Sequence, residues 1–361
     1  MILSERLWRT TKRLFHRLAN STRISYILLS VFLLFVVGVA DYFSGDEISI
    51  LIFYLLPVSA SAWFVGRGAG AAISIYCGMT WAIVDFLTSR TYSHVLIPYW
   101  NGLVMSGFFL IIALTLSNLK KALDRENALA REIQEGMLPA AIRPIPGYQI
   151  AAAWKPEKSI GGDYYDIIDL GPTTVGVCIA DVIGHGIPAA ILMANLQASI
   201  RIYAAQSLKP RELCMRVNEF MTQNVGPGKF VTFFYGVLDT AADKLVFTNA
   251  GHPLPLVVRH NGEILKLETA DPVLGLFKSV EYHQHELNLA SGDIAILYTD
   301  GLLEIANLRG DFFGEERLAA ILAANQKAKA QGICDMILAA ASDFANNFFQ
   351  DDLTILVVKK E

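Results

Sequence analysis

Cysteine is scarce in this chain of 361 residues, and no two cysteines are spaced as a CxxC pair. That absence leaves no basis for a zinc ribbon or a disulfide framework. The four cysteines are Cys77, Cys178, Cys214 and Cys334. A cysteine-based phosphatase needs an arginine six residues after its nucleophile, but those places hold Ile83, Gly184, Phe220 and Ala340. Catalysis by a cysteine nucleophile is therefore excluded.

An excess of positive charge is also missing, since the formal net charge of −4 gives no reason to expect nucleic-acid binding. Charged residues are nearly absent from four apolar stretches in the first third of the chain. A bilayer core needs about 20 mostly apolar residues per helix. The stretches are Ile24–Ala40, Ile48–Gly66, Gly68–Phe86 and Tyr99–Leu119. They predict an all-α, four-helix transmembrane domain over residues 24–118.

Basic residues flank these stretches unevenly, and positive charge favours the cytoplasmic side of a membrane. Residues 1–23 and the segment after the fourth stretch are basic, whereas the first connection is acidic and Arg90 in the third is an exception. This pattern predicts a multi-pass protein of the bacterial inner membrane with both termini in the cytoplasm. The flanking residues are Arg6, Arg9, Lys12, Arg13, Arg17, Arg23, Asp46, Glu47, Arg67, Lys120, Lys121 and Arg125.

Three ionisable residues, Asp41, Asp85 and His94, fall near the outer ends of the apolar stretches. Ionisable groups at membrane depth are candidate functional sites, whereas groups at the interface are simply solvated. The sequence leaves both interpretations open for these three residues.

Residues 119–139 are predicted to form a helical linker that leaves the membrane and stops at Pro139. Residues along it follow the alternating spacing of a coiled-coil seam. Either the seam joins two copies in a homodimer, which we expect, or the helix packs on its own catalytic domain. The seam residues are Leu119, Ala122, Glu126, Leu129, Ile133 and Gly136.

Residues 140–361 alternate short β-rich runs with turns and group their helical patterns between the hairpins. That arrangement predicts an α+β domain with antiparallel sheets. Asn261-Gly262 is a strong hairpin signal between two of the runs. The expected strands are 148–154, 174–180, 231–238, 245–249, 254–258, 264–267, 293–298 and 353–358, and the expected helices are 187–206, 210–225, 315–324 and 331–349.

Four acidic motifs lie next to strands in this half of the chain. Several carboxylates that face one cleft would repel one another unless a cation lay between them. Oxygen ligands without nearby cysteine or paired histidine favour Mg²⁺ or Mn²⁺ over zinc, and two such ions can activate a water for attack on phosphorus. The motifs are GGDYYD at 161–166, DVIGHG at 181–186, TDG at 299–301 and DDLT at 351–354.

These motifs, together with NAGHPLPL at 249–256 and the segment Ala130–Pro139, resemble the PPM-type serine/threonine protein phosphatases. The similarity is greatest to their bacterial SpoIIE/RsbU-like branch and covers about residues 130–361. It implies an αββα sandwich, two antiparallel sheets flanked by helices, with two Mn²⁺ or Mg²⁺ ions between the sheets. It implies nothing about residues 1–118.

Carried over by position, the resemblance implies that Asp163, Asp181, Asp300 and Asp351 are the catalytic metal ligands, joined by the backbone carbonyl of Val182. Lys158 stands where distant members carry a phosphate-binding arginine, although an exposed loop lysine is equally consistent with the sequence. Residues expected to support the ligands from outside are Asp166, Gly184, His185, Asn249, His252 and Asp352.

The resemblance also implies a substrate class: phosphoserine or phosphothreonine on a small anti-sigma-factor antagonist. Two alternatives remain at this point. One is a non-catalytic membrane receptor that uses the same domain to bind a partner. The other is a diguanylate cyclase, suggested by Gly161-Gly162-Asp163, although Tyr164 and Tyr165 replace the acid and phenylalanine of a GGDEF loop.

Overall fold

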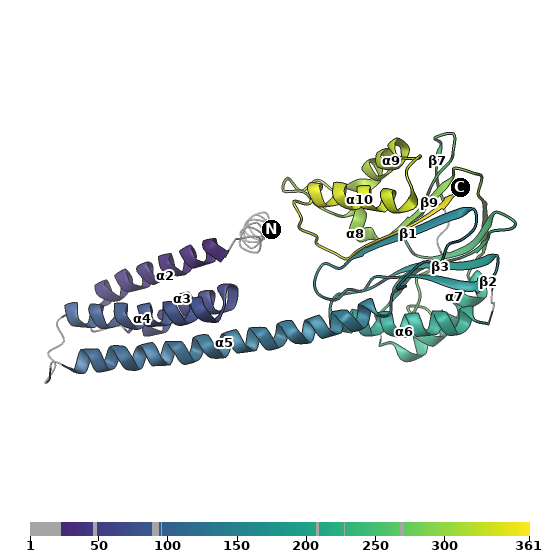
Figure 1. The fold of residues 1–361 in the computed structure, drawn as a ribbon. Helices are drawn as coiled ribbons and strands as arrows, with labels where there is room; N and C mark the ends of the chain where they lie inside the picture. The colour runs from purple at the N-terminus through teal and green to yellow at the C-terminus, as the bar shows by residue number, and fades with distance from the viewer. Residues whose placement is uncertain are drawn as a thin grey trace, which may run out of the picture. The chain divides into compact units, whose positions relative to one another are not determined.

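The computed structural model describes residues 23–45, 49–88, 94, 96–206, 209–226, 228–267 and 271–361. The chain divides into two compact units, Met1–Glu126 and Asn127–Glu361. The helix α5, Ile97–Glu135, runs from the first unit into the second (Figure 1). Most of the predicted basic N-terminus, together with Asp46, Glu47 and Arg90, lies outside the described residues.

The first unit is helical, as predicted, but the number of predicted spans is wrong. Among the described residues, three helices are long and apolar enough to cross a membrane: α2 (Arg23–Ser44), α4 (Arg67–Leu87) and α5. The second stretch forms only a shorter apolar helix, Leu51–Val65. It is built from a 3₁₀ turn η1 (Leu51–Tyr54), α3 (Leu55–Ala60) and a π turn η2 (Ser61–Val65).

The reason lies at the ends of that stretch. Gly66 has φ 121°, a conformation that glycine adopts without strain, and it stops the helix there. The first helical residue is Leu51 rather than Ile48. What remains is shorter than the about 20 residues that a bilayer core needs. An even number of spans therefore no longer supports the placement of both termini on one side.

The second unit contains two five-stranded sheets in which every pair of named strands is antiparallel. One sheet has the order β1-β10-β9-β6-β7 and the other the order β2-β3-β4-β5-β8. The strands are β1 (Tyr148–Lys155), β2 (Tyr164–Gly171), β3 (Thr174–Val182), β4 (Val231–Asp239), β5 (Lys244–Ala250), β6 (Leu256–Val258), β7 (Ile264–Lys266), β8 (His285–Asn288), β9 (Ile294–Tyr298) and β10 (Leu353–Lys360).

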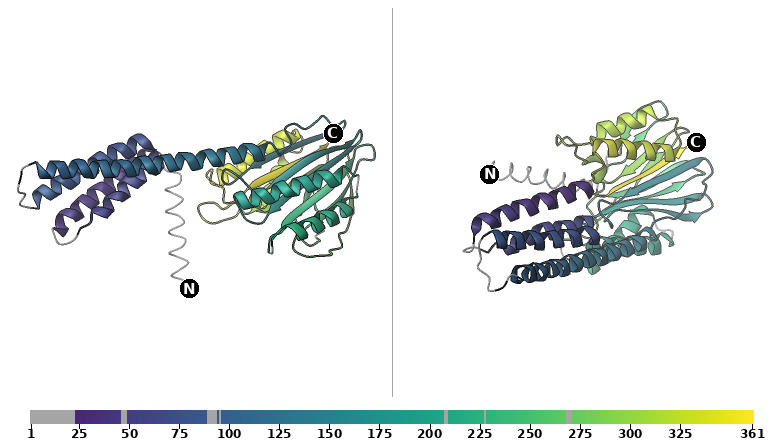
Figure 2. Two further views of the ribbon diagram at one scale, coloured as in Figure 1. Left: turned by 90° about the horizontal axis from the view of Figure 1, so that it is seen from below. Right: turned by 60° about the vertical axis from the view of Figure 1, so that its left-hand side comes forward.

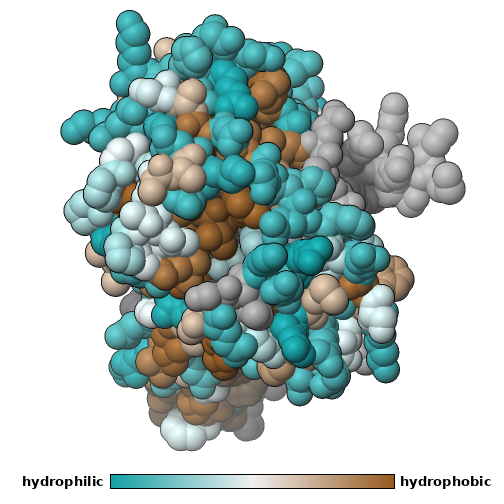
Figure 3. Space-filling view, turned by 90° about the vertical axis from the view of Figure 1, so that its right-hand side faces the viewer, coloured by the Kyte–Doolittle hydropathy of each residue, from teal (hydrophilic) through white to brown (hydrophobic). Residues whose placement is uncertain are grey.

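Helices cover the outer face of each sheet, so the unit has four layers (Figures 1 and 2). α6 (Ile187–Ala204) and α7 (Pro210–Asn224) lie on the β2–β8 sheet, and α9 (Gly314–Ala324) and α10 (Ala330–Phe344) lie on the other. Three apolar cores result, one between the sheets and one under each helical layer. The predicted αββα arrangement is confirmed. Seen from the C-terminal side, the surface is mostly hydrophilic, with apolar residues showing in its middle (Figure 3).

The sequence did not predict three elements of this unit: β2, β8 and α8 (Asp300–Leu303). Strand β2 escaped because Asp166 and Asp169 interrupt its apolar pattern. The predicted hairpin at Asn261-Gly262 is confirmed, since Val258 pairs with Ile264 across it.

Candidate functional site

The predicted ligands lie at the ends of four strands, two from each sheet. Asp163 directly precedes β2 and Asp181 is near the end of β3, and these strands are antiparallel neighbours with Tyr164 opposite Ala180. Asp300 follows β9 and Asp351 precedes β10, which are also antiparallel neighbours. The end of one strand therefore lies beside the start of its neighbour in each sheet. All four acids come to one edge of the sandwich.

Asp163 is the most constrained of the four, with 1% of its surface exposed. Its Oδ2 accepts hydrogen bonds from the hydroxyls of Thr299 (2.8 Å) and Thr354 (2.6 Å), both on the opposite sheet. The Thr299 hydroxyl in turn accepts a bond from the Thr354 backbone N–H at 3.0 Å. Contacts between the two sheets at this edge are thus polar and buried.

Asp352 anchors the loop that leads into Asp163. Its Oδ1 accepts the N–H of Glu157 at 2.7 Å and its Oδ2 accepts the N–H of Gly162 at 2.6 Å. A side chain at Gly161 would collide with this carboxylate, because a Cβ there would lie 2.3 Å from Asp352 Oδ2. The GGD sequence therefore needs its first glycine for close approach to Asp352.

The carboxylates raise one another's pKa values. Burial raises the pKa of Asp163 well above its usual range, and the charges of Asp181 and Asp352 add to this. Burial together with the charges of Asp300 and Asp351 raises the pKa of Asp181 to about 7. Burial and Asp351 also raise the pKa of Asp300. A cation would relieve this repulsion, so the donor chemistry fits a divalent ion that prefers oxygen ligands.

The carboxylates nevertheless do not form a closed ion site by themselves. Within the part of the chain that the structure describes, no three Asp, Glu, His or Cys side chains are grouped so that they could hold one ion. A backbone oxygen lies at the same edge: a Cβ at Gly162 would be 2.8 Å from the carbonyl oxygen of Val182. The second glycine of GGD thus faces the carbonyl that the sequence suggested as a ligand.

Asn249 and His252 hold a turn through reciprocal hydrogen bonds. The Asn249 amide donates to the His252 carbonyl at 3.0 Å, and the His252 N–H donates to Asn249 Oδ1 at 2.8 Å. The His252 ring contacts the Thr232 hydroxyl at 2.9 Å, and burial lowers the pKa of His252 to about 3. The imidazole is therefore neutral at physiological pH.

Three other expected residues are exposed. Gly184 and His185 lie in the loop between β3 and α6. The ammonium of Lys158 lies 3.4 Å from its neighbour Glu157, and 57% of the Lys158 side chain is exposed.

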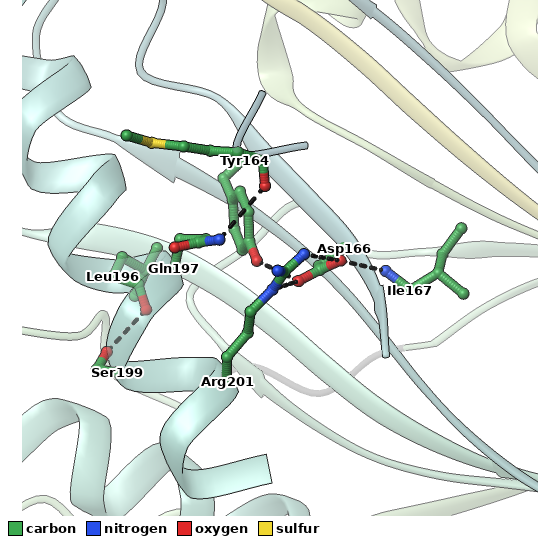
Figure 4. Close-up of polar contacts among 8 residues, drawn as sticks. Tyr164, Asp166, Ile167, Leu196, Gln197, Ser199 and Arg201 are labelled. Atoms are coloured by element: carbon green, nitrogen blue, oxygen red, sulfur yellow. Dashed lines mark hydrogen bonds and ion pairs between the residues drawn. The ribbon is translucent and has the colours of Figure 1, made fainter. Parts of the chain in front are cut away.

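Asp166 does not join the other acids, because its side chain lies on the face of β2 that is turned toward α6. Its carboxylate pairs with Arg201 of α6 at 2.8 Å and accepts a bond from the Tyr164 hydroxyl at 2.6 Å (Figure 4). It also accepts the N–H of Ile167 at 2.9 Å. Tyr164 and Asp166 are two residues apart on β2, so both face α6, whereas Asp163 lies before the strand. This ion pair, buried at Asp166 and half-exposed at Arg201, joins a helix to its sheet.

The sequence reading missed four residues at this edge or beside it: Arg201, Thr299, Thr354 and Gln134. The Gln134 amide, at the end of α5, donates to the Gly161 carbonyl at 2.6 Å and accepts the Gly161 N–H at 3.0 Å. A glutamine in a polar helix carries no signal of such a role. The threonines, in contrast, stood inside the acidic motifs.

Comparison with known protein families assigns the second half of the chain to one of them. The sequence pattern described as Stage II sporulation protein E (SpoIIE) matches residues 171–361, over half of the chain. The chain belongs to the SpoIIE family. A second pattern, described as a domain of unknown function (DUF4118), matches residues 24–133, so the SpoIIE domain follows a separate N-terminal module.

Curated proteins of known name agree with the SpoIIE assignment. Phosphoserine phosphatase RsbU of Bacillus subtilis is 25% identical over 248 residues, 68% of this chain and 73% of that protein. Protein IcfG of Synechocystis is 28% identical over 278 residues, 69% of this chain and 44% of that protein, so the chain spans less than half of IcfG. The predicted homology to phosphoserine phosphatases of the SpoIIE/RsbU-like branch is confirmed.

A solved structure shows the same fold for the SpoIIE domain. The SiaA-PP2C domain of Pseudomonas aeruginosa superposes with a TM-score of 0.60 at 22% identity, covering 67% of this chain and 99% of that domain. At this level of identity the likeness concerns the fold alone.

Proposed function

We propose that this chain is a membrane-anchored, metal-dependent phosphatase that hydrolyses phosphoserine or phosphothreonine on a cytoplasmic signalling protein. The observation that carries the proposal is the meeting of Asp163, Asp181, Asp300 and Asp351 at one edge between two sheets. Carboxylates that raise one another's pKa are costly to keep without a cation. Their retention supports a catalytic rather than a structural role.

Asp163, Asp181, Asp300, Asp351 and the Val182 carbonyl would hold two Mg²⁺ or Mn²⁺ ions. When bound, such ions lower the pKa of a shared water and offset negative charge on the phosphoryl oxygens. The chain supplies the geometry: the strand ends fix where each carboxylate can lie, and the charges of Asp300 and Asp351 beside the other sheet act on Asp181. Water and the substrate phosphate would complete the ion sites, since the side chains alone do not.

The test is Mn²⁺-dependent hydrolysis of p-nitrophenyl phosphate and of a phosphoserine protein by the full chain in detergent micelles. Asp300→Asn should reduce kcat by at least about 100-fold, a loss of ~2.7 kcal/mol of transition-state stabilisation. Asp335→Asn, at an exposed position on α10, is the matched control and should behave as the wild type. A folded wild type without metal-dependent activity would contradict the proposal.

That negative result would favour the second candidate, a receptor whose phosphatase-like domain only binds a partner. The observation that favours this binding-only candidate is that the described side chains form no closed ion site. A protein that binds a phosphoprotein without hydrolysing it would separate this candidate from the first.

We propose a bacterial inner-membrane location with a cytoplasmic catalytic domain and an anti-sigma-factor antagonist as the substrate. The three apolar helices and the basic flanks support the location. The similarity to RsbU supports the substrate class. Accessibility of single introduced cysteines to an impermeant thiol reagent would check which side each terminus occupies. Loss of the phosphate from a panel of phosphorylated antagonists would check the substrate.

The linker seam supports a homodimer as the working form. Leu119, Ala122, Glu126, Leu129, Ile133 and Gly136 are all exposed in the single chain. Apolar residues among them, such as Leu129 at 58% exposed and Ile133 at 54%, would be covered by a second copy. Ile133→Glu should yield monomers in mass photometry, whereas Ala128→Glu, exposed but outside the seam, should not. Dimers that persist in Ile133→Glu would contradict the seam.

A further inference from the structure

Two threonine hydroxyls from one sheet bind a single carboxylate oxygen that belongs to the other. Thr299 and Thr354 have no exposed surface, and Asp163 has 1%. Both hydroxyls lie within 2.8 Å of Asp163 Oδ2, and neither threonine has a role in the function proposed above. Threonine is not needed at position 354 for strand formation alone, since valine fills buried strands as well.

The hydrogen-bond directions leave little freedom. Thr299 Oγ1 accepts the Thr354 N–H at 3.0 Å, so its own hydrogen is available for Asp163. A carboxylate oxygen accepts about two hydrogen bonds, and the two hydroxyls supply both for Oδ2. Oδ1 is the Asp163 oxygen that these two bonds leave for other partners. The threonines therefore select which oxygen of this carboxylate is available to a cation or a water.

The same contacts connect the two halves of the acidic edge. Thr299 directly precedes Asp300 at the end of β9, and Thr354 lies at the start of β10, just after Asp351 and Asp352. Asp163 precedes β2 on the other sheet. Any change in the separation of the sheets at this edge would stretch these bonds. The bonds thus join the pair Asp163 and Asp181 to the pair Asp300 and Asp351.

We propose that Thr299 and Thr354 are positioning residues that fix the carboxylate of Asp163 and the distance between the two pairs of acids, and so set the affinity for divalent cations. This inference rests on the proposed metal-dependent function. Groups that orient a metal ligand typically change metal affinity by about 10–100-fold when removed. We expect that range for loss of either hydroxyl.

The experiment is titration of Mn²⁺ into the chelator-treated full chain in detergent micelles, followed by calorimetry and by electron paramagnetic resonance of free Mn²⁺. Thr354→Val and Thr299→Val should weaken binding about 10–100-fold, whereas Thr354→Ser and Thr299→Ser should stay within about 3-fold of the wild type. Thr248→Val is the matched control. Thr248 lies on β5, is also fully buried, and donates a hydrogen bond to the His283 carbonyl at 2.9 Å. It should lower the unfolding temperature but leave Mn²⁺ affinity unchanged.

Folded valine variants that bind Mn²⁺ like the wild type would overturn the positioning role. If the valine variants do not fold, the serine variants decide. A serine variant that keeps the hydroxyl but binds Mn²⁺ about 10-fold more weakly than the wild type would show that the hydroxyl does not set the affinity. A wild type that binds Mn²⁺ and hydrolyses phosphomonoesters while the valine variants match it would refute only this inference. A wild type that binds no Mn²⁺ would refute the proposed function as well.

Discussion

Gln134 binds both polar groups of the Gly161 backbone through its side-chain amide, at 2.6 Å and 3.0 Å. Gln134 is 3% exposed although it lies on the last turn of an otherwise exposed part of α5. Gly161 is two residues before Asp163, and the next N–H along the chain is bound by Asp352. The end of the linker helix and the acidic edge therefore share one loop. This is a direct route by which a shift of the helix would move a proposed metal ligand.

Gln134→Ala should destabilise the protein and weaken metal-dependent activity together. The change leaves two buried backbone groups unpaired, at about 1–3 kcal/mol each when no water replaces the amide. Thermal unfolding and the Mn²⁺ concentration for half-maximal activity measure the two effects. Gln197→Ala is the control, because its single bond to the Met137 carbonyl is long at 3.4 Å. Unchanged Mn²⁺ dependence in folded Gln134→Ala would show that the contact is only structural.

Gly301→Ala should abolish activity because the site has no space for a methyl group. A Cβ at Gly301 would lie 1.9 Å from the backbone oxygen of Asp352, so the chain between Asp351 and Leu353 would have to move. Overpacking of this kind costs about 1–3 kcal/mol or more. In Gly332→Ala, on helix α10, the nearest atom would be 3.9 Å away. That control should gain up to ~1 kcal/mol from helix propensity. An active, stable Gly301→Ala would contradict the close packing of α8 against the segment that leads into β10.

Arg201→Met should lower stability without changing kcat. It leaves the Asp166 carboxylate, 1% exposed, without its cation. Breaking a fully buried pair costs ~3–5 kcal/mol; because the Arg201 side chain is 50% exposed, we expect a smaller loss of about 2 kcal/mol. Arg216→Met, at an exposed pair with Glu219 of 3.6 Å, should change stability by less than ~1 kcal/mol. Denaturant unfolding gives the first quantity and steady-state hydrolysis the second. A large fall in kcat would mean that Asp166 acts on the site after all.

Asp293 should make stability depend on pH in the acid range. Burial acts to raise its pKa, but hydrogen bonds from the Ala290 N–H, the Arg259 guanidinium and the His260 N–H outweigh burial and hold the pKa of Asp293 below its usual value. A lowered pKa in the folded state means that the ionised form stabilises the fold. This contribution is complete above the unfolded-state value of about 3.9 and is lost as the pH falls through the lower folded value.

Asp293→Asn should therefore be less stable than the wild type by about 1.5–3 kcal/mol at pH 7, the net worth of hydrogen bonds to a charged group. The difference should shrink as the pH falls below the unfolded-state value of about 3.9, because the wild-type carboxyl then begins to take up its proton. Asp239→Asn, at a turn carboxylate that accepts only two neighbouring N–H groups, is a milder comparison. A difference that does not vary with pH would show that the charge is unimportant.

Local pattern in the sequence was enough for most of the second unit. The apolar runs at 174–180 and 231–238 correspond to β3 and β4. They could be predicted because the pattern of apolar residues along a short segment shows which side chains are buried. The acidic motifs were visible for the same reason, since each stands beside a run of strand-forming residues. Even the one predicted span too many in the first unit had a local sign, because Gly66 ends the shorter apolar helix Leu51–Val65.

By itself, the sequence determined most of the order of helices and strands in the second unit, the family and the aspartates to examine. Only the tertiary structure decided which polar groups meet. Asp166 stands three residues from Asp163 in the same motif, yet it pairs with Arg201, 35 residues away, because the two sides of β2 face different layers. Thr354 reaches Asp163 across 191 residues of chain. Such contacts depend on how sheets and helices stack, and no local spacing encodes that arrangement.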